Sequence, residues 1–286
     1  MVNLVEITHL VELLDRFALT PIVDRALSEA GVSREALATG PGFVPYALEA
    51  VLLESVARAI GDRHLGARIG NVFDYDRYRA CAGYVLAAPT LGDALTRGRR
   101  AYPLLHPGSS IVLRERGDHV VVGRRAPLHS MVGHRHLDEG TVPIIRHVIR
   151  HFLGPNWTPD WVDIPSPEGR DSTGLEALLG AELRHDAPMP GVAVRLADLA
   201  TPNPAPPGPE RTVTLNELPA LMRVAPLETM EDAVREVLRV HLALGDISED
   251  SVARHLSLGA RSLQRALTSE GVSFRDIRAR VLEERA

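Results

Sequence analysis

The sequence predicts an α+β domain, with helices first and an antiparallel sheet after them, followed by an all-α region with a helix-turn-helix layout. Helical spacing and capping signals occupy most of residues 1–110. From Ile111 onwards, short runs of apolar residues alternate with polar ones. Short amphipathic helices then fill residues 246–286. The predicted order is therefore helices, sheet, and helices again.

The first part reads as mostly helix. Thr20 and Pro21 favour a helix start, and Gly31 favours its end. Thr90 and Asp93 form another capping pair. The predicted helices are 21–30, Val44–Ile60, a short helix from Asp62 to near Gly70, Arg79–Ala88, and one from Thr90 through Leu104.

The sheet begins with a hairpin. Ile111–Arg116 and His119–Arg125 alternate around Gly117 and Asp118, which favour a tight turn. Helical spacing returns over Gly140–Leu153. Further short strands are predicted at Trp161–Ile164, Ala181–His185 and Val192–Leu196.

A proline-rich stretch marks the predicted domain boundary. Thr201–Arg211 contains five prolines in eleven residues, which excludes regular structure there. An amphipathic helix over Glu228–Leu244 is assigned to the part that follows. The predicted division is a domain of residues 1–200, a linker region of residues 201–226, and a helical domain of residues 227–286.

The C-terminal stretch predicts three helices. The first, Glu249–Leu256, has Ser248 as its N-cap. After a tight Ser257-Leu258-Gly259 connection comes the second, Ala260–Glu270, whose Leu263 and Leu267 lie four residues apart on the inward face. Ser273 and Asp276 cap a third helix, with Phe274, Ile277 and Val281 on one face.

The outward face of the second helix carries long hydrogen-bond donors. Arg261, Gln264 and Arg265 stand at i, i+3 and i+4, so their side chains project together. Arginine pairs with guanine and glutamine with adenine through two hydrogen bonds in the major groove. The same pattern also fits an ordinary helical hairpin with solvated arginines.

A resemblance favours the first of these interpretations. Val252-Ala253, Leu256, "LGARSLQRAL" (258–267) and "EGVSF" (270–274) resemble the first helix-turn-helix of the AraC/XylS transcription regulators. The resemblance implies base contacts from Arg261, Gln264 and Arg265 and a phosphate contact near Ser273; Ser262 and Arg275 are further phosphate candidates. Gly259 and Ala260 depart from the family's usual serine cap. Family members continue into a second helix-turn-helix, so the DNA-binding domain is expected to be incomplete here.

The upstream region carries a second resemblance. "AIGDRHLGARIG" (59–70), "AGYVLAAPTLGDAL" (82–95) and "LGAELRHDAPMPGVAVRLADLATP" (179–202) resemble the arabinose-binding-like sensor domain of one AraC branch. This resemblance implies an effector site, with an apolar pocket expected between helices and sheet. The sequence does not identify the ligand-binding residues.

Charge and cysteine content narrow the function classes. The formal net charge of −5 argues against wholesale binding of nucleic acid, and residues 246–286 hold seven arginines against seven acidic residues. The lone Cys81 excludes an intrachain disulfide and fits a reducing compartment. No apolar run reaches membrane-spanning length. The chain is expected in the cytoplasm, without a membrane partner.

The prediction is a ligand-responsive regulator of AraC type that binds double-stranded DNA and a small-molecule effector. A homodimer is expected, and RNA polymerase is a further candidate partner. No cofactor, metal or enzymatic activity is expected. A second hypothesis is a truncated sensor or partner protein that pairs with full-length relatives without binding DNA productively.

A third hypothesis is a metal-dependent enzyme built on histidines. The candidates are His129, His134, His136, His147 and His151. His147 and His151 lie four residues apart, a spacing that suits two metal ligands, but the glutamate of a zinc-protease helix is missing between them. The simpler interpretation is that these histidines are solvated or hydrogen-bonded.

Overall fold

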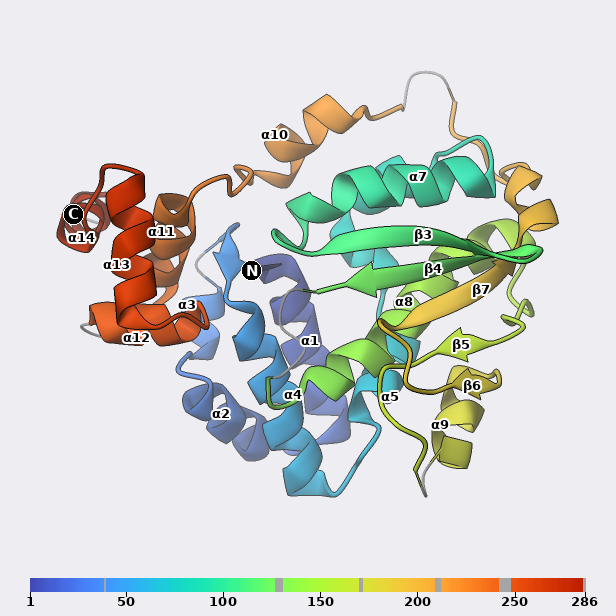
Figure 1. Ribbon diagram of the computed structural model, residues 1–286, viewed down its shortest axis with the longest axis horizontal. Coiled ribbons are helices and arrows are strands. Elements are labelled where there is room, and N and C mark those ends of the chain that lie inside the picture. The colour runs from blue at the N-terminus through green and yellow to red at the C-terminus, as the bar shows by residue number, and fades with distance from the viewer. Residues whose placement is uncertain (39, 127–130, 170–171, 209–211, 242–247, 285–286) are drawn as a thin grey trace.

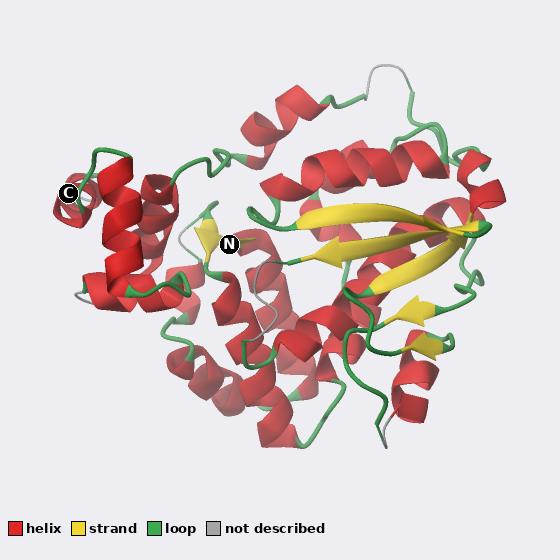
Figure 2. Ribbon diagram, in the orientation of Figure 1, coloured by secondary structure: helices red, strands yellow, loops and turns green. Residues whose placement is uncertain are grey.

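A mixed sheet with helices packed against it forms the larger part of the molecule, and a group of helices lies at the C-terminal end (Figures 1 and 2). The structure is a computed structural model that describes residues 1–286 except 39, 127–130, 170–171, 209–211, 242–247 and 285–286. The larger sheet has the strand order β3-β4-β7-β5-β6. Its strands are β3 (Ser110–Arg116), β4 (His119–Arg125), β5 (Val162–Asp163), β6 (Leu183–Arg184) and β7 (Gly191–Arg195).

The helices of the larger part come from the first 180 residues. They are α1 (Leu4–Phe17), α2 (Thr20–Glu29), α3 (Arg34–Leu37), α4 (Tyr46–Ile60), α5 (Leu65–Val72), α6 (Ala80–Leu86), α7 (Leu91–Ala101), α8 (His134–Leu153) and α9 (Ser172–Leu179). Short 3-10 turns are η1 (Tyr75–Tyr78), η2 (Tyr102–Leu104), η3 (Leu196–Ala200) and η5 (Leu215–Glu217). The fold is α+β, as the sequence predicted.

The predicted hairpin is confirmed, whereas the prediction of a wholly antiparallel sheet is wrong. β3 pairs with β4 in antiparallel register from Ser110↔Arg125 to Arg116↔His119. β5 and β6, however, pair in parallel. α9 lies between them in the chain, and a crossover of this kind returns the chain in the same direction. The sheet is therefore mixed.

The predicted helices in the first 110 residues are found, with three corrections at their starts. α5 begins at Leu65 with His64 as its N-cap, three residues after the predicted start at Asp62. Leu19, and not Thr20, is the N-cap of α2. Val44 belongs to a two-residue strand, because β2 (Phe43–Val44) pairs antiparallel with β1 (Val2–Asn3). The predicted capping pair is confirmed, since Thr90 Oγ1 accepts a hydrogen bond from the Asp93 backbone N–H at 3.2 Å.

α5 and α8 cross with their backbones in contact. A Cβ placed on Gly66 would lie 2.0 Å from the carbonyl oxygen of His136, and one on Gly70 would lie 2.5 Å from that of Gly140. The glycines allow this approach because they have no side chain at the crossing.

α8 begins at His134, six residues before the predicted start at Gly140.

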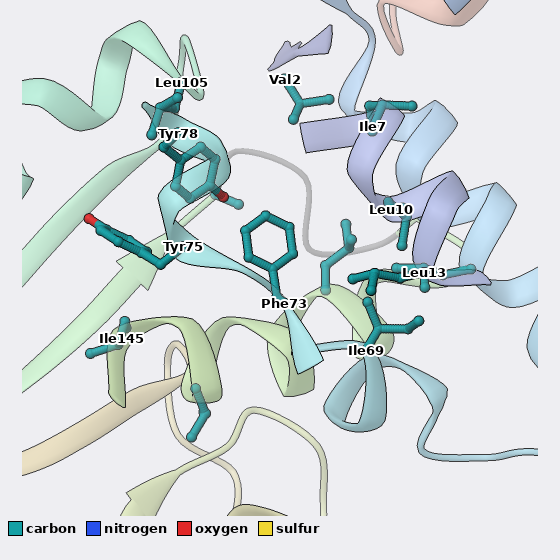
Figure 3. Packing of buried hydrophobic residues seen from close by; sticks show 14 of the residues in the cluster. Val2, Ile7, Leu10, Leu13, Ile69, Phe73, Tyr75, Tyr78, Leu105 and Ile145 are labelled. Carbon is teal, nitrogen blue, oxygen red and sulfur yellow. The ribbon is translucent and has the colours of Figure 1, made fainter. Parts of the chain in front are cut away.

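The main hydrophobic core joins the helices to one face of the sheet. On β4, Val120 and Val122 belong to this core, whereas Val121 packs with Trp161 and Ala193 on the opposite face. Figure 3 shows Phe73 between the α1 side chains Ile7, Leu10 and Leu13 and the tyrosines of η1. Alternate residues of β4 therefore point to the two opposite faces of the sheet.

The region predicted as a linker is packed against the larger part. The Asn203 side-chain amide donates to the carbonyl oxygens of Leu86 at 2.7 Å and Ala88 at 2.8 Å. α10 (Leu218–Met222) follows, and its Leu218 is buried in the main core. Residues 209–211 of the proline-rich stretch lie outside the described residues.

The C-terminal helices have a core of their own. They are α11 (Met230–His241), α12 (Glu249–His255), α13 (Ala260–Ser269) and α14 (Phe274–Glu283). This core consists of Val234, Val237, Leu238, Val252, Ala253, Leu263, Leu267, Ile277 and Val281. The end of the predicted helix Glu228–Leu244 and the start of the stretch at Asp246 lie outside the described residues.

Candidate functional site

A largely apolar cavity lies between the helices and the sheet. Its apolar walls come from α6, α7, β3, β4 and α8, and they include Val85, Leu95, Ile111, Val122, Ile144 and Val148. Its polar side chains include Glu6, Tyr78, Tyr102, His106 and Arg124. An enclosed apolar space with a few convergent polar groups is the usual form of a small-molecule site. The location agrees with the pocket that the sequence predicted.

A buried carboxylate anchors one end of the cavity. Glu6 Oε2 accepts hydrogen bonds from the Tyr78 hydroxyl and from Nε2 of His106, both at 2.7 Å. The ring of Tyr102 stacks on that of His106 with 4.7 Å between centroids. Burial opposes the charge on Glu6, but the neighbouring His106 and the hydrogen bonds lower the pKa of Glu6 below its ordinary value. Glu6 is therefore an ionised group inside the core.

A buried arginine stands beside it. Arg124 Nη1 donates to the hydroxyl of Tyr46, and Nη2 donates to Asp138 Oδ1 at 3.4 Å. Arg124 Nε has no hydrogen-bond partner among the described residues, and neither has Nδ1 of His106. Nearby, burial raises the pKa of Glu49 well above its ordinary value, so the charged form of this carboxyl group is disfavoured. The cavity thus holds a buried cation with unused hydrogen-bonding capacity.

Strand register places Arg124 in the cavity. Val120, Val122 and Arg124 alternate along β4, so all three face the helices. Sequence reasoning did not select Arg124, Glu6 or His106. The available signal was an arginine at an inward position of an otherwise apolar strand, because a buried charge needs a specific partner.

Cys81 contributes to the apolar wall rather than to chemistry. It lines the cavity and is buried. Burial alone raises the pKa of its thiol to about 12. A thiol with so high a pKa is not a nucleophile at neutral pH.

Hydrogen bonds lead from the cavity wall to the C-terminal helices. The backbone N–H of Asn3 donates to the carbonyl oxygen of Leu105 at 2.8 Å, and Leu105 lines the cavity. Asn3 on β1 pairs with Phe43 on β2. The backbone N–H of Phe43 donates to Glu236 Oε2 on α11 at 2.8 Å. One side of the β1–β2 pair therefore contacts the cavity wall, and the other contacts the C-terminal unit.

A second contact between the two parts involves histidines. The rings of His241 on α11 and His255 on α12 lie 4.0 Å apart between centroids. A Cβ placed on Gly31 would lie 3.6 Å from His241 Cε1 and 3.5 Å from His255 Cε1. Burial, and then the neighbouring His255, lowers the pKa of His241 to about 4. Both rings pack against the end of α2.

The predicted base-reading residues share one face of α13. Arg261, Gln264 and Arg265 are exposed, whereas Leu263 and Leu267 point into the C-terminal core. Among the described residues, neither Arg261 nor Arg265 has an acidic group within 4.0 Å. The salt bridges within this distance are made by other arginines. The structure thus brings these three side chains together at the surface, but it does not test what they bind.

The phosphate candidates lie at helix starts. Ser262 is half-buried in the first turn of α13, and Arg275 is exposed in the first turn of α14. Ser273 is the N-cap of α14: its Oγ accepts from the Asp276 backbone N–H at 3.2 Å and donates to Asp276 Oδ2 at 2.6 Å. The Ser273 hydroxyl is therefore already engaged in capping.

The histidines of the third hypothesis make separate contacts. His147 stacks on Tyr75, and His151 Nε2 lies 3.2 Å from Asn203 Oδ1. His134 Nδ1 lies 2.8 Å from the Met131 carbonyl oxygen, and His136 Nδ1 accepts from the Gly66 N–H. His129 lies outside the described residues. Within the part of the chain that is described, no group of three or more histidine, cysteine or acidic residues could hold a metal ion.

Residues 23–203 match the family model described as the arabinose-binding domain of AraC transcription regulator, N-terminal. The match covers more than half of the chain, and the chain therefore belongs to this family of AraC-type transcription regulators. A search of curated proteins found no match. No helix in the described ranges is long and apolar enough to cross a membrane.

Among solved structures, the chain is similar to the crystal structure of transcriptional regulator CdpR from Pseudomonas aeruginosa. The sequences are 17% identical, and the similarity covers 77% of this chain and 72% of that chain with a TM-score of 0.46.

Proposed function

We propose that this chain is a DNA-binding transcription regulator that responds to a small-molecule effector. Residues 1–200 would sense the effector, residues 201–226 connect the two parts, and residues 227–286 bind DNA. The observation that carries this proposal is the hydrogen-bonded connection from the cavity wall, through β1 and β2, to Glu236 in the unit that presents α13. Membership of the AraC family supports it.

The effector would bind in the cavity. Its mouth and walls are formed by segments that are separate in sequence, from Glu6 on α1 to Val148 on α8. A ligand held there contacts α1, α7, β4 and α8 at once. It can shift an equilibrium between two arrangements only if it binds one of them better.

The β1–β2 pair would transmit the difference. Leu105 and His106 line the cavity, and the hydrogen bond from Asn3 ties β1 to this segment. On the other side, the Met1 side chain packs against the C-terminal core, and Glu236 holds β2. A displacement of residues 104–106 would therefore change how α11 packs against β2.

DNA would be read by α13 in the major groove. Arg261, Gln264 and Arg265 project from its exposed face, and each good bidentate contact with a base contributes about 1–3 kcal/mol of discrimination. Ser262, Ser273 and Arg275 would contact phosphates. Glu270, at the end of α13, is turned to the start of α11, where it accepts from the Met230 N–H at 2.7 Å.

Dimerisation would raise the affinity for DNA. A single small module buries about 600–1,000 Å² on DNA, and two modules tethered over two half-sites bind far more tightly. A homodimer is therefore part of the proposal, with RNA polymerase as a further partner at a promoter.

A second candidate function is a sensor or partner protein that does not bind DNA productively. It is favoured by the balance of charge in the C-terminal stretch, where seven arginines face seven acidic residues over 246–286. Such a surface gains little from phosphate neutralisation, which supplies most non-specific affinity.

Selection of bound sequences from random duplex DNA at low salt distinguishes the two. Wild-type protein is compared with an Arg261→Ala/Arg265→Ala variant and with an Arg25→Ala/Arg99→Ala variant, which removes two arginines from the larger part. The regulator proposal expects an enriched motif that the first variant loses and the second retains. No enrichment with the wild type would support the sensor or partner alternative.

A further inference from the structure

The size of the cavity limits what it can hold. Its volume is about 90 Å³. One water molecule needs about 10–15 Å³ on this measure, so the space corresponds to roughly six water molecules. A ligand that fills it without large movement of the walls is therefore a small molecule with a short body.

The walls favour an apolar body. Val85, Leu95, Ile144 and Val148 offer no hydrogen bond. The Thr141 hydroxyl in the same wall is already engaged, because it donates to the Leu137 carbonyl oxygen at 2.8 Å. A sugar would bring several hydroxyl groups, and burying each of them without a hydrogen-bond partner is unfavourable. The arabinose of the family's name is a poor match for this lining.

The polar end of the cavity is short of acceptors. The Glu6 carboxylate is shared by Tyr78 and His106. Two nitrogen atoms remain without partners among the described residues, Nε of Arg124 and Nδ1 of His106. Since a guanidinium N–H can only donate, the group that completes this end must include an acceptor.

The charge at this end also favours an anion. Arg124 is 5% exposed, and its Nη2 lies 3.4 Å from Asp138, longer than the 2.7–2.9 Å typical of a charge-assisted N–H···O bond. Its other partner, the Tyr46 hydroxyl, is neutral, because burial raises the pKa of Tyr46 well above its ordinary value. The guanidinium therefore has a long ion pair to Asp138 and a nearby carboxylate in Glu6, but its Nε has no hydrogen-bond partner among the described residues.

We propose that the cavity binds a small carboxylate with a short apolar body. The carboxylate accepts hydrogen bonds from Nε of Arg124 and Nδ1 of His106, and the apolar body lies between α7 and α8. This inference rests on the proposed function, because it names the chemical class of the effector.

Calorimetry with four probes tests the class. The probes are pentanoate, pentan-1-ol, pentylamine and L-arabinose. Pentanoate is expected to bind at least tenfold more tightly than the alcohol or the amine, and L-arabinose is expected not to bind. Equal or tighter binding of pentan-1-ol, pentylamine or L-arabinose would overturn the proposal.

Variants locate the site. Arg124→Met should bring the affinity for pentanoate down to that for pentan-1-ol, and circular dichroism checks that the variant folds. Should it not fold, His106→Phe removes the second proposed contact and is expected to lower pentanoate affinity about tenfold. Pentanoate affinity that is unchanged in a folded Arg124→Met or His106→Phe variant contradicts the assignment.

A matched pair of glycine variants separates this cavity from other sites. Gly98 on α7 lines the cavity, and a Cβ there meets nothing within 4 Å, so Gly98→Leu fills the space. Gly83 on α6 is equally open but exposed outside the cavity, and Gly83→Leu is the control. Pentanoate binding should be lost in Gly98→Leu and kept in Gly83→Leu. Binding that survives Gly98→Leu would place the ligand elsewhere and overturn the proposal.

The same variants keep the two proposals apart. If none of the four probes binds, the carboxylate class is wrong. Gly98→Leu is then compared with Gly83→Leu for affinity toward the selected DNA. A change confined to Gly98→Leu would retain the cavity as the regulatory site for a ligand of another class, and no change would count against the regulatory role itself.

Discussion

The carboxylate of Glu236 accepts a hydrogen bond from the backbone N–H of Phe43 across 2.8 Å, although the two residues are 193 positions apart. Glu236 is buried, and a Cβ placed on the neighbouring Gly42 would lie 2.7 Å from its Oε2. The fit between α11 and β2 is therefore close, and it depends on a charged acceptor placed against the free edge of a very short strand.

Removal of this acceptor should loosen the C-terminal helices. Glu236→Ala leaves the buried Phe43 N–H without a partner, which costs about 1–3 kcal/mol. Hydrogen exchange is expected to speed up at Phe43 and along α11. Glu228→Ala, an exposed glutamate two residues before α11, is the control. Equal exchange in both variants would show that the Glu236 contact does not hold the two parts together.

Acid should destabilise the folded protein through His241, which packs with His255 against Gly31. Its pKa is lowered to about 4 in the folded protein, mainly by burial, whereas an unfolded histidine titrates near 6.5. The unfolded chain therefore binds more protons below pH 6.5, and stability falls as the pH falls from about 6.5 to about 4.

The measurement is urea unfolding at pH 7 and pH 5. Wild-type protein should lose on the order of 1 kcal/mol more than His241→Phe between these values. His185→Phe, a change on the far edge of the sheet, serves as the control. An identical loss in wild type and His241→Phe would exclude His241 as the source.

The crossing of α5 and α8 should not tolerate a methyl group. Gly66→Ala places a Cβ 2.0 Å from the His136 carbonyl oxygen, and both backbones would have to move. We expect a destabilisation of about 1–3 kcal/mol. Gly83→Ala, at an open helical position, should instead stabilise by about 1 kcal/mol. Denaturant midpoints of the two variants measure the difference.

The proposed base contacts and phosphate contacts should separate by their effects. Gln264→Ala is expected to relax preference at one base position, with a cost of about 1–3 kcal/mol for the preferred site. Arg275→Ala should weaken binding evenly across sequences and reduce the salt slope by about 1. Binding measured on the selected site and on single-base variants, at several salt concentrations, tests both. An even loss from Gln264→Ala would remove it from the base-reading set.

The C-terminal helices could be predicted almost to the residue because their signals are local. Ser248 and Ser273 cap helices through backbone groups three residues away, and Leu263 and Leu267 repeat at helical spacing. The hairpin around Gly117 and Asp118 is local in the same way. Short-range patterns of this kind are complete within a dozen residues.

The errors fall where the structure depends on distant partners. β1 and β2 are two residues long and pair across forty positions, so neither has a period to detect. α8 starts earlier than predicted because its buried face includes Asp138 and Glu139, which interrupt the apolar pattern. Glu139 is accommodated by His64, 3.3 Å away, a residue 75 positions earlier.

The polar residues of the cavity escaped prediction for the same reason. Its existence between helices and sheet followed from the fold class, but its polar residues did not follow from any motif. Glu6 and His106 are 100 positions apart, and Arg124 meets Tyr46 across 78. Only the folded chain brings these groups into one place.

The close crossing of α5 and α8 restricts the movement of the α8 wall of the cavity. Because the backbones of the two helices touch at Gly66 and Gly70, α8 cannot move toward α5 to admit a larger guest. α7 has no such restriction at Gly98, where a side chain would meet open space. Relatives that recognise bulkier molecules would therefore be expected to differ first in the residues of α7, while the position of α8 stays the same.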